Sequence, residues 1–386
     1  MKEQKKQPEL RFKGFTDDWE ERKLGDEVLI VMGQSPNSEN YTDNPNDHIL
    51  VQGNADMKNG HVFPRVWTTQ VTKQAEKNDL ILSVRAPVGD IGKTAYDVVI
   101  GRGVAAIKGN EFIFQNLGKM KSNGYWTRYS TGSTFESINS SDIKEAIISI
   151  PRIEEQQKIG SFFKQLDDTI ALHQRKHDLL KKLKQGYLQQ MFPVKNEVVP
   201  QLRFSGFKDD WGQIKFKNII IRVNKSSNSN KLPKIEFEDI SAGEGRLNKD
   251  ISKKFDTRKG IEFEPNDILY GKLRPYLKNW LMPNFKGIAL GDFWIFRSTN
   301  NISNFVYNLI QTNKYQKAAN DTSGTKMPRS DWKKVSETMF FISKNLEEQQ
   351  KIGEFFQKLD QDLSLQQLKI EQLQQLKQAY LQKLFP

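Results

Sequence analysis

The sequence predicts an α+β protein made of two like domains, related by a pseudo-two-fold axis and joined by two long helices that form an antiparallel coiled coil. A short motif, PELRFKGFTDDWE from Pro8, returns as PQLRFSGFKDDWG from Pro200. A helix-like segment, IEEQQKIGSFFKQLDD from Ile153, returns as LEEQQKIGEFFQKLDQ from Leu346. Because both motifs recur in the same order around a variable stretch, the chain is an internal duplication.

Length and composition restrict the class of protein. A chain of 386 residues has room for two or three domains. Its formal net charge of +12 favours a polyanionic partner, because each cation that neutralises a phosphate releases a counterion. The absence of cysteine excludes disulfides, thiolate nucleophiles and Cys-ligated zinc. No apolar run approaches the length of about 20 residues that spans a bilayer, so we expect a cytoplasmic protein with no membrane partner.

The first repeated element, called the DDW motif below, covers residues 8–20 and 200–212. It ends in Trp19 in the first copy and Trp211 in the second, each preceded by two aspartates and two phenylalanines. The acidic pair would repel phosphate. We therefore expect the aromatic side chains to anchor the motif on a hydrophobic core rather than to stack on nucleic-acid bases.

The variable regions, residues 20–150 and 212–342, contain short β-like runs bounded by Gly, Pro, Asn or Asp. Strands and helices alternate without the regular spacing of βαβ units, which is typical of an α+β domain. The two regions share landmarks but little sequence, so one fold carrying two different surfaces is expected. The expected strands include 80–84, 104–107, 268–270 and 293–296, and the expected helices are 112–120 and 304–317.

The second repeated element is a long helix, residues 154–190 and again 347–384, free of proline and rich in Leu, Lys, Gln and Glu. Assigning a seven-residue repeat to each helix gives the same a and d positions in both, called the seam below. This match predicts a coiled coil about 55 Å long within the chain. The symmetry of the halves makes it antiparallel and places His177 opposite Gln366 and His173 opposite Ile370. The seam residues are Phe163, Leu166, Ile170, His173, His177, Leu180, Lys184, Tyr187 and Met191, matched by Phe356, Leu359, Leu363, Gln366, Ile370, Leu373, Lys377, Tyr380 and Leu384.

Catalytic motifs are missing from the sequence. It has no GxxxxGK[ST] loop, no strand followed by GxGxxG, and no Pro-Pro dipeptide, which the [DN]PP[YF] motif of amino-methyltransferases requires. His173 and His177 have the spacing of a zinc pair, but no Glu follows the first, and both fall on the seam. A structural role is favoured for both, and we expect neither catalytic nor metal-binding residues.

Candidate nucleic-acid ligands follow the expected strands. Cations stand beside turn-forming residues, and Gly/Ser/Thr loops could donate hydrogen bonds to phosphate. Taken singly, each of these segments could also be a solvated loop or an ordinary turn with no ligand. Their recurrence in both halves, with Arg85 near one proline and Arg274 before another, favours a binding role. The candidates are Arg85, Lys93, Arg102, Ser133 and Thr134 in the first half, and Lys272, Arg274, Lys278, Thr325, Lys326 and Arg329 in the second.

The whole arrangement resembles the specificity subunit of type I restriction-modification systems. The resemblance rests on the LRFKGFTDDW start, on helices that begin IEEQQKIG and LEEQQKIG, and on helices that end LKQGYLQQMFP and LKQAYLQKLFP. It implies a non-enzymatic subunit that binds double-stranded DNA, reads a bipartite target with one domain per half-site, and separates the half-sites by the helical pair. It also implies two methyltransferase subunits and restriction/translocase subunits as partners, which would hold S-adenosylmethionine, ATP and Mg, with no cofactor on this chain.

Further expectations concern boundaries and docking. Apolar side chains at the helix starts, Ile159, Phe162, Ile352 and Phe355, would otherwise be exposed to water, so we expect them to dock the methyltransferase subunits.

Two alternatives stay open: a DNA methyltransferase or nuclease whose site is unrecognised, and a basic coiled-coil scaffold that binds protein or membrane. The expected segments are recognition domain 1 at 1–152, a spacer helix region at 153–193, recognition domain 2 at 194–343, and a second spacer helix at 344–386.

Overall fold

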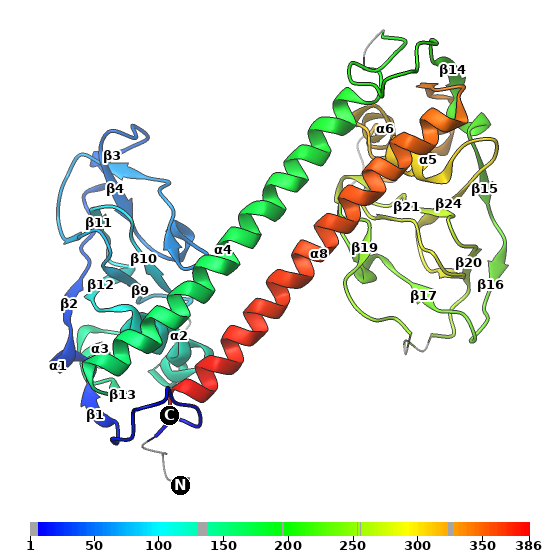
Figure 1. Ribbon diagram of the computed structural model, residues 1–386. Coiled ribbons are helices and arrows are strands. Elements are labelled where there is room, and N and C mark those ends of the chain that lie inside the picture. Colours follow the sequence, from blue (N-terminus) through cyan, green and yellow to red (C-terminus); the bar gives the residue numbers. More distant parts are fainter. Residues whose placement is uncertain (1–6, 130–136, 195–196, 253, 255, 323–326) are drawn as a thin grey trace. The chain divides into compact units, whose positions relative to one another are not determined.

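The computed structural model describes residues 7–129, 137–194, 197–252, 254, 256–322 and 327–386 (Figure 1). The chain divides into two compact units. Unit 1 comprises Met1–His173 and Lys369–Pro386, and unit 2 comprises Gln174–Leu368. Each unit therefore contains a globular part and a segment of both long helices, α4 (Ile153–Gln190) and α8 (Leu346–Leu384).

Unit 1 is built on two mixed sheets and a two-stranded ribbon. The ribbon pairs β1 (Glu20–Lys23) with β13 (Ile147–Ile150), the larger sheet has the order β2-β12-β9-β10-β6-β5, and the smaller has the order β3-β7-β4-β11-β8. The strands are β2 Leu29–Met32, β3 Tyr41–Thr42, β4 His48–Val51, β5 Met57–Lys58, β6 His61–Val62, β7 Trp67–Thr68, β8 Gln74–Ala75, β9 Leu80–Ser83, β10 Ile91–Lys93, β11 Val98–Ile100 and β12 Val104–Lys108. The helices are α1 Leu24–Glu27, α2 Glu111–Ser122 and α3 Ser140–Lys144, with the 3-10 turns η1 Ser38–Asn40, η2 Asn54–Asp56 and η3 Tyr125–Tyr129.

Unit 2 repeats the same plan. Its ribbon pairs β14 (Gly212–Lys215) with β25 (Met339–Ile342), and its sheets have the orders β15-β24-β21-β22, β16-β20-β23-β17 and β18-β19. The strands are β15 Ile220–Val223, β16 Ser226–Ser227, β17 Lys234–Ile235, β18 Ile240–Ser241, β19 Arg246–Leu247, β20 Gly260–Phe263, β21 Ile268–Gly271, β22 Trp280–Leu281, β23 Gly287–Ala289 and β24 Phe293–Ser298. The helices are α5 Ser303–Leu309, α6 Asn313–Ala319 and α7 Trp332–Glu337, with η4 Phe216–Asn218, η5 Phe237–Asp239 and η6 Pro275–Leu277.

Strands β9 and β21 are the central strands of their sheets, and both are buried along their whole length. Each is covered on both faces, which explains why the sequence shows a continuous apolar run there instead of an alternating one. Each also follows an asparagine with positive φ, Asn78 at 77° and Asn266 at 68°. The two units therefore share this turn before the corresponding strand.

One predicted helix differs from the structure. Residues 304–317 were expected as a single helix, but α5 ends at Leu309 and α6 begins at Asn313. The Thr312 hydroxyl donates to the carbonyl of Leu309 at 2.7 Å and accepts from the backbone of Tyr315. Thr312 therefore caps α6, and this local alternative to helical hydrogen bonding interrupts the run.

The DDW motif anchors on the core, as predicted. Trp19 and Trp211 are each only 3% exposed. Trp19 packs edge-on against Phe385, which follows α8, at 6.1 Å between ring centroids. Trp211 packs in the same way against Phe192, which follows α4, at 6.2 Å. In each unit the aromatic end of one long helix thus closes the same core as the motif.

A buried ion pair fixes the motif to the start of each long helix. Arg11 forms two hydrogen bonds with Glu155, both at 2.8 Å, and Arg203 makes the equivalent pair with Glu348 at 2.5 and 2.9 Å. Glu348 is completely buried and also accepts from the indole N–H of Trp211 at 3.1 Å. A bidentate arginine combines charge with fixed geometry, so it sets the angle at which the motif meets the helix.

The two long helices run antiparallel within each unit, as predicted. In unit 1 Asp167 of α4 pairs with Lys377 of α8 at 2.6 Å. In unit 2 Lys184 pairs with Asp360, also at 2.6 Å. Every predicted seam position is buried or half-buried, and His177 is only 3% exposed. The two seam lysines, Lys184 and Lys377, therefore form ion pairs at positions where the heptad pattern predicts hydrophobic contacts.

The premise for the docking residues is wrong. Ile159 and Ile352 are each 1% exposed and belong to the cores of their own units. Phe162 is half-buried between Phe12 and Tyr380, at centroid distances of 6.0 and 5.0 Å. Phe355 is half-buried in the same way between Phe204 and Tyr187. The DDW motif covers these helix starts, and a partner therefore cannot reach the isoleucines.

Candidate nucleic-acid interface

Two of the predicted DNA ligands in unit 1, Arg85 and Arg102, converge on one hollow. Arg85 follows β9 and Arg102 lies in the turn between β11 and β12. The hollow has a volume of about 290 Å³ and a largely polar lining. Both arginine side chains are exposed, and neither has an ion-pair partner among the described residues. Its lining residues are Ser35, Tyr41, Gln52, Gly53, Asn54, Ser83, Arg85, Ala86, Arg102 and Gly103.

Buried contacts hold the floor of this hollow in place. The carboxylate of Asp56, which is 4% exposed, accepts from the backbone N–H groups of Gln52 at 2.7 Å and Gly53 at 3.2 Å. Across the hollow, Gly103 lies so close that an added Cβ would stand 2.0 Å from the carbonyl oxygen of Gln52. The backbone of Arg102 also donates to the hydroxyl of Ser35 at 3.1 Å. Because these contacts fix the backbone of the hollow, they also fix the positions from which its side chains can contact a ligand.

The chemistry of the hollow suits a nucleic acid. Guanidinium groups such as those of Arg85 and Arg102 bind phosphate, or bind guanine in the major groove through two hydrogen bonds. Carboxamides such as those of Gln52 and Asn54 match the donor and acceptor of adenine. The Asn54 amide N–H already donates to the carbonyl of Pro87 at 2.9 Å, which leaves Gln52 better placed to read a base.

The other predicted ligands in unit 1 lie elsewhere. Lys93 forms an ion pair with Glu111 and lies 5.4 Å from the centre of the Phe114 ring. It does not line the hollow, and its charge is already matched. Ser133 and Thr134 lie outside the described residues.

In unit 2 the structure brings three predicted cations together at the end of β21. Asp292 lies 2.8 Å from Arg329 and 3.6 Å from Lys272. The backbone of Arg274 donates to the carbonyl of Pro328 at 2.7 Å, which places Arg274 beside the same loop. Arg274 and Lys278 are exposed, and neither has an ion-pair partner in the part of the chain that the structure describes. Thr325 and Lys326 lie outside that part.

The two sites correspond, but with a different alignment from the predicted one. Arg85 forms an isolated β-bridge with Ser137, and the matching bridge in unit 2 joins Leu273 to Arg329. Arg85 therefore occupies the position of Leu273, and Arg274 follows one residue later. The sequence comparison paired Arg85 with Arg274 because both are charged. The structure instead pairs Arg85 with Leu273, because each forms the bridge to the opposite loop.

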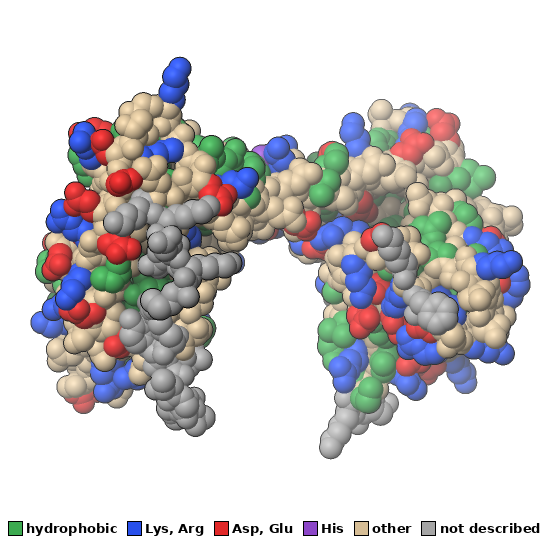
Figure 2. All heavy atoms as spheres, turned by 90° about the horizontal axis from the view of Figure 1, so that it is seen from below, with side chains coloured by type: hydrophobic (Ala, Val, Ile, Leu, Met, Phe, Trp, Pro, Cys, Tyr) green, Lys and Arg blue, Asp and Glu red, His purple; other side chains and the backbone are tan. Residues whose placement is uncertain are grey.

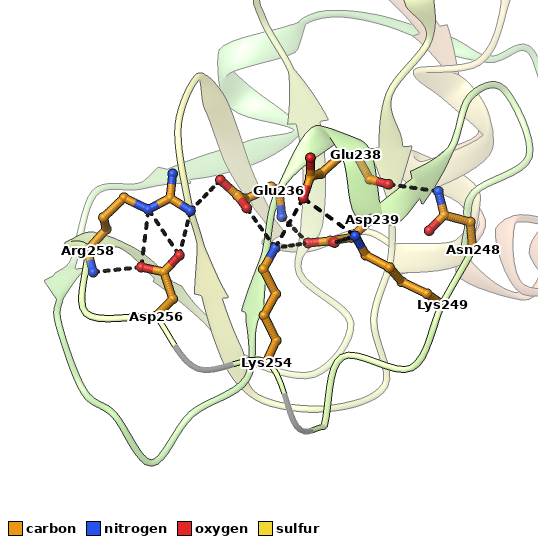
Figure 3. A network of polar contacts seen from close by, with 8 residues as sticks. All are labelled: Glu236, Glu238, Asp239, Asn248, Lys249, Lys254, Asp256 and Arg258. Atoms are coloured by element: carbon orange, nitrogen blue, oxygen red, sulfur yellow. Dashed lines mark hydrogen bonds and ion pairs between the residues drawn. The ribbon is translucent and has the colours of Figure 1, made fainter.

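A second group of cations in unit 2 is held by internal ion pairs (Figure 3). Asp239, which is completely buried, contacts Lys249 at 2.9 Å and Lys254 at 2.7 Å. Burial favours the neutral acid, but the two lysines outweigh it and lower the pKa of Asp239. Nearby, Arg258 lowers the pKa of Asp256 to about 2. This network stabilises the fold, so its cations are poor candidates for phosphate.

Charge on the surface is mixed rather than segregated. On the face shown in Figure 2, Lys and Arg side chains alternate with Asp and Glu over each unit. An excess of +12 charges therefore does not create a single basic face on this side.

The residues that sequence reasoning missed are mostly uncharged. Ser35, Gln52 and Asn54 line the unit 1 hollow but stand far from Arg85 in the sequence. The one available signal was the pair of acidic turns at Asp56 and Asp239, which precede equivalent hairpins.

Within the described residues, no cluster of three or more His, Cys, Asp or Glu side chains is arranged for a metal. Within the same residues, no helix has the length and apolar character needed to cross a membrane.

Comparison with known proteins agrees with this layout. Residues 16–182 match the family described as the type I restriction modification DNA specificity domain. The putative type I restriction enzyme MjaX specificity subunit of Methanocaldococcus jannaschii is 33% identical over 176 residues, which cover 44% of this chain and 41% of that protein. The EcoDI specificity subunit of Escherichia coli is 22% identical over 253 residues, covering 58% of this chain and 55% of that protein. The matched segments thus span about half or less of these relatives.

Solved structures extend the likeness to the whole chain at the level of fold. The S subunit of a type I restriction-modification system from M. genitalium superposes with a TM-score of 0.67 at 16% identity, covering 98% of this chain and 99% of that one. A chain from a study of complex assembly in the type I R-M system gives a TM-score of 0.51 at 16% identity, covering 95% and 97%. The resemblance predicted from the sequence is therefore confirmed: residues 16–182 match the type I restriction modification DNA specificity domain, and the whole chain has the fold of a solved type I S subunit.

Proposed function

We propose that this chain is the sequence-specific DNA-binding subunit of a type I restriction-modification complex, in which each unit reads one half of a bipartite duplex target. One observation carries the proposal. The hollow that Arg85 and Arg102 line lies inside the segment that matches the DNA specificity domain. Its lining combines groups that hold phosphate with groups that read base edges.

The two units are expected to read different sequences. In unit 1 the exposed arginines face a hollow that also contains Gln52. In unit 2 the equivalent loops present Arg274 beside the Asp292 ion pairs. Since the shared fold carries different side chains at the reading positions, the two half-sites differ, and a bipartite, asymmetric target results.

Catalysis is assigned to partner subunits in this proposal. Two methyltransferase subunits would supply S-adenosylmethionine chemistry, and restriction/translocase subunits would use ATP and Mg. The long helices offer a surface for such partners, because several leucines on them are exposed. These outward leucines are Leu172, Leu179 and Leu183 on α4, and Leu365, Leu368 and Leu376 on α8.

The test is selection of bound duplexes from a random library, followed by sequencing. We expect the wild-type chain to enrich two conserved segments with a fixed spacing. Arg102→Ala should relax or alter one segment only, because it removes a contact in unit 1. Lys77→Ala is the matched control, since it removes an equal charge from an exposed residue of unit 1 that does not line the hollow.

Other outcomes would favour the alternatives. Enrichment of no sequence would support a scaffold that binds DNA only through charge, or does not bind it. Methylation or nicking of DNA by the purified chain alone would show that it is an enzyme. Loss of both half-sites in Arg102→Ala would contradict the division of labour between the units.

A further inference from the structure

A tight turn in unit 2 holds apolar side chains out in solvent. The turn is η6, Pro275–Leu277, which follows the strand β21. Pro275 is buried, but Tyr276 is 56% exposed and Leu277 is 41% exposed. Met327 precedes Pro328, whose carbonyl accepts from the Arg274 backbone, and it is 52% exposed as well. The exposed side chains of Tyr276 and Leu277 are called the projection below.

The backbone of this turn is strained and firmly held. Arg274 and Lys278, which flank η6, both have positive φ, at 49° and 56°. That conformation is unfavourable for a residue with a Cβ, and it persists where the surrounding structure imposes it. Here the Arg274 N–H donates to Pro328 at 2.7 Å, and the Lys278 carbonyl accepts from Gly243 at 2.9 Å. The backbone that carries the projection is therefore anchored at both ends.

Cations bracket the projection. Arg274 precedes the turn and Lys278 follows it, and the side chains of both are exposed. Lys272 and Arg329 lie beside them and share the single carboxylate of Asp292. The surroundings of the apolar tip are therefore net positive. An apolar tip between cations is the arrangement by which DNA-binding proteins insert a wedge between base pairs while gripping the flanking phosphates.

The matching turn of unit 1 has no such projection. After Pro87, which corresponds to Pro275, come Val88 and Gly89 in place of a tyrosine and a leucine. Val88 is half-buried against the core, and a Cβ on Gly89 would lie 2.4 Å from the Trp126 ring. The projection is thus a property of unit 2 rather than a requirement of the shared fold.

We propose that Tyr276 and Leu277 insert between stacked base pairs of the half-site that unit 2 reads, with Arg274 and Lys278 on the adjacent phosphates. This inference rests on the proposed DNA-binding function and adds a mode of recognition to it. Unstacking is easiest at pyrimidine–purine steps, so the unit 2 half-site should contain a TA or CA/TG step where the wedge enters. The half-site read by unit 1 carries no such requirement.

The experiment uses the full chain and the duplex selected by it, with 2-aminopurine placed in turn at each position of both half-sites. Binding of the wild-type chain should raise 2-aminopurine fluorescence at one step of the unit 2 half-site, since unstacking relieves quenching. The double variant Tyr276→Ala/Leu277→Ala should lose this signal and bind about 10-fold more weakly. Tyr276→Phe should keep the signal, because stacking needs the ring and not the hydroxyl.

Controls separate the possible failures. Tyr96→Ala removes a comparably exposed tyrosine, 47% exposed, from unit 1 and should change neither signal nor affinity. Tight wild-type binding with no fluorescence change at any position would overturn the wedge and leave the proposed function intact. Failure of the wild-type chain to select any duplex would instead overturn the proposed function. An alanine variant that binds DNA normally but no longer assembles with partner subunits would show that the projection is a protein contact.

Discussion

At the scale of single residues, the strongest constraints are buried charges that the sequence pattern does not announce. Glu155 and Glu348 lie in the first turn of each long helix, where the helix dipole favours an anion. Each is also clamped by an arginine from the DDW motif, Arg11 or Arg203. The motif recurs because these contacts fix how each unit joins its helix.

Removing one clamp should destabilise unit 2 strongly. Arg203→Ala leaves the fully buried carboxylate of Glu348 without its cation, which typically costs about 3–5 kcal/mol. Urea unfolding measured by circular dichroism checks this. Arg22→Ala is the control, since its ion pair with Glu20 is exposed to solvent and should contribute little to stability. Equal losses from both variants would contradict the role of burial.

A histidine on the seam should make stability depend on pH. Burial, aided by the nearby Lys181, lowers the pKa of His177 below its usual 6.5. The folded state thus prefers the neutral ring, and its contribution is fully present above pH 6.5 and is lost as pH falls through the lowered pKa. His177→Ile, which copies the equivalent Ile370 of the repeat, should flatten the stability profile in that range. Unchanged slopes between wild type and variant would refute it.

At the scale of elements, two glycines decide how closely the long helices approach their domains. A Cβ at Gly160 would lie 2.9 Å from the side chain of Glu111, and one at Gly353 would lie 2.7 Å from that of Asn304. These residues stand at the starts of α2 and α5. Helical glycine is therefore kept at these positions because the neighbouring helix leaves no room, despite its poor helix propensity.

Substitution of these glycines should separate packing from propensity. Gly160→Ala should lower the free energy of unfolding, because the added methyl group meets the first turn of α2. Gly186→Ala in the same helix should raise it by about 1 kcal/mol, because no atom lies within 4 Å of the added Cβ. Thermal unfolding of both variants measures the difference. A stabilised Gly160→Ala would show that α2 yields without cost.

The outward leucines should matter for assembly and not for folding. The double variant Leu365→Ser/Leu368→Ser removes two side chains that are 62% and 50% exposed. We expect the thermal midpoint to stay unchanged while co-purification with a methyltransferase subunit falls at least several-fold. Leu202→Ser, a 40% exposed leucine in the second DDW motif, is the control. Normal assembly of the double variant would exclude these leucines as the docking surface.

At the scale of the whole molecule, each long helix begins in one unit and ends in the other. The chain therefore passes between the two units through two long helices. Figure 1 draws α4 and α8 as continuous helices. In the proposed function, helix length then fixes the spacing between half-sites.

Lengthening both helices together tests this relation. Inserting one heptad into α4 and one into α8 at matching seam positions keeps the seam in register. The accepted spacer should change while both half-site sequences stay the same, as measured by duplex selection. A heptad inserted into α4 alone shifts the seam against α8 and should lower stability instead. An unchanged spacer in the double insertion would refute the helices as the ruler.

The sequence by itself determined the duplication, the two long helices with their seam, the buried central strands and the anchoring of Trp19 and Trp211. These features follow from local periodicity and from motifs that are repeated, so they need no knowledge of long-range contacts. The prediction of Phe163 and Phe356 as seam residues is confirmed, because it depended only on this local periodicity.

Only the tertiary structure decided which charges are free and which side chains are covered. Lys93 is neutralised by Glu111, Ile159 is sealed beneath its own domain, and Arg85 meets Arg102 in a hollow. Each of these outcomes depends on residues distant in sequence, brought together by sheet order and by the packing of the helix starts. A pattern of neighbours along the chain specifies an element, but the burial and pairing of a charge depend on what folds against it.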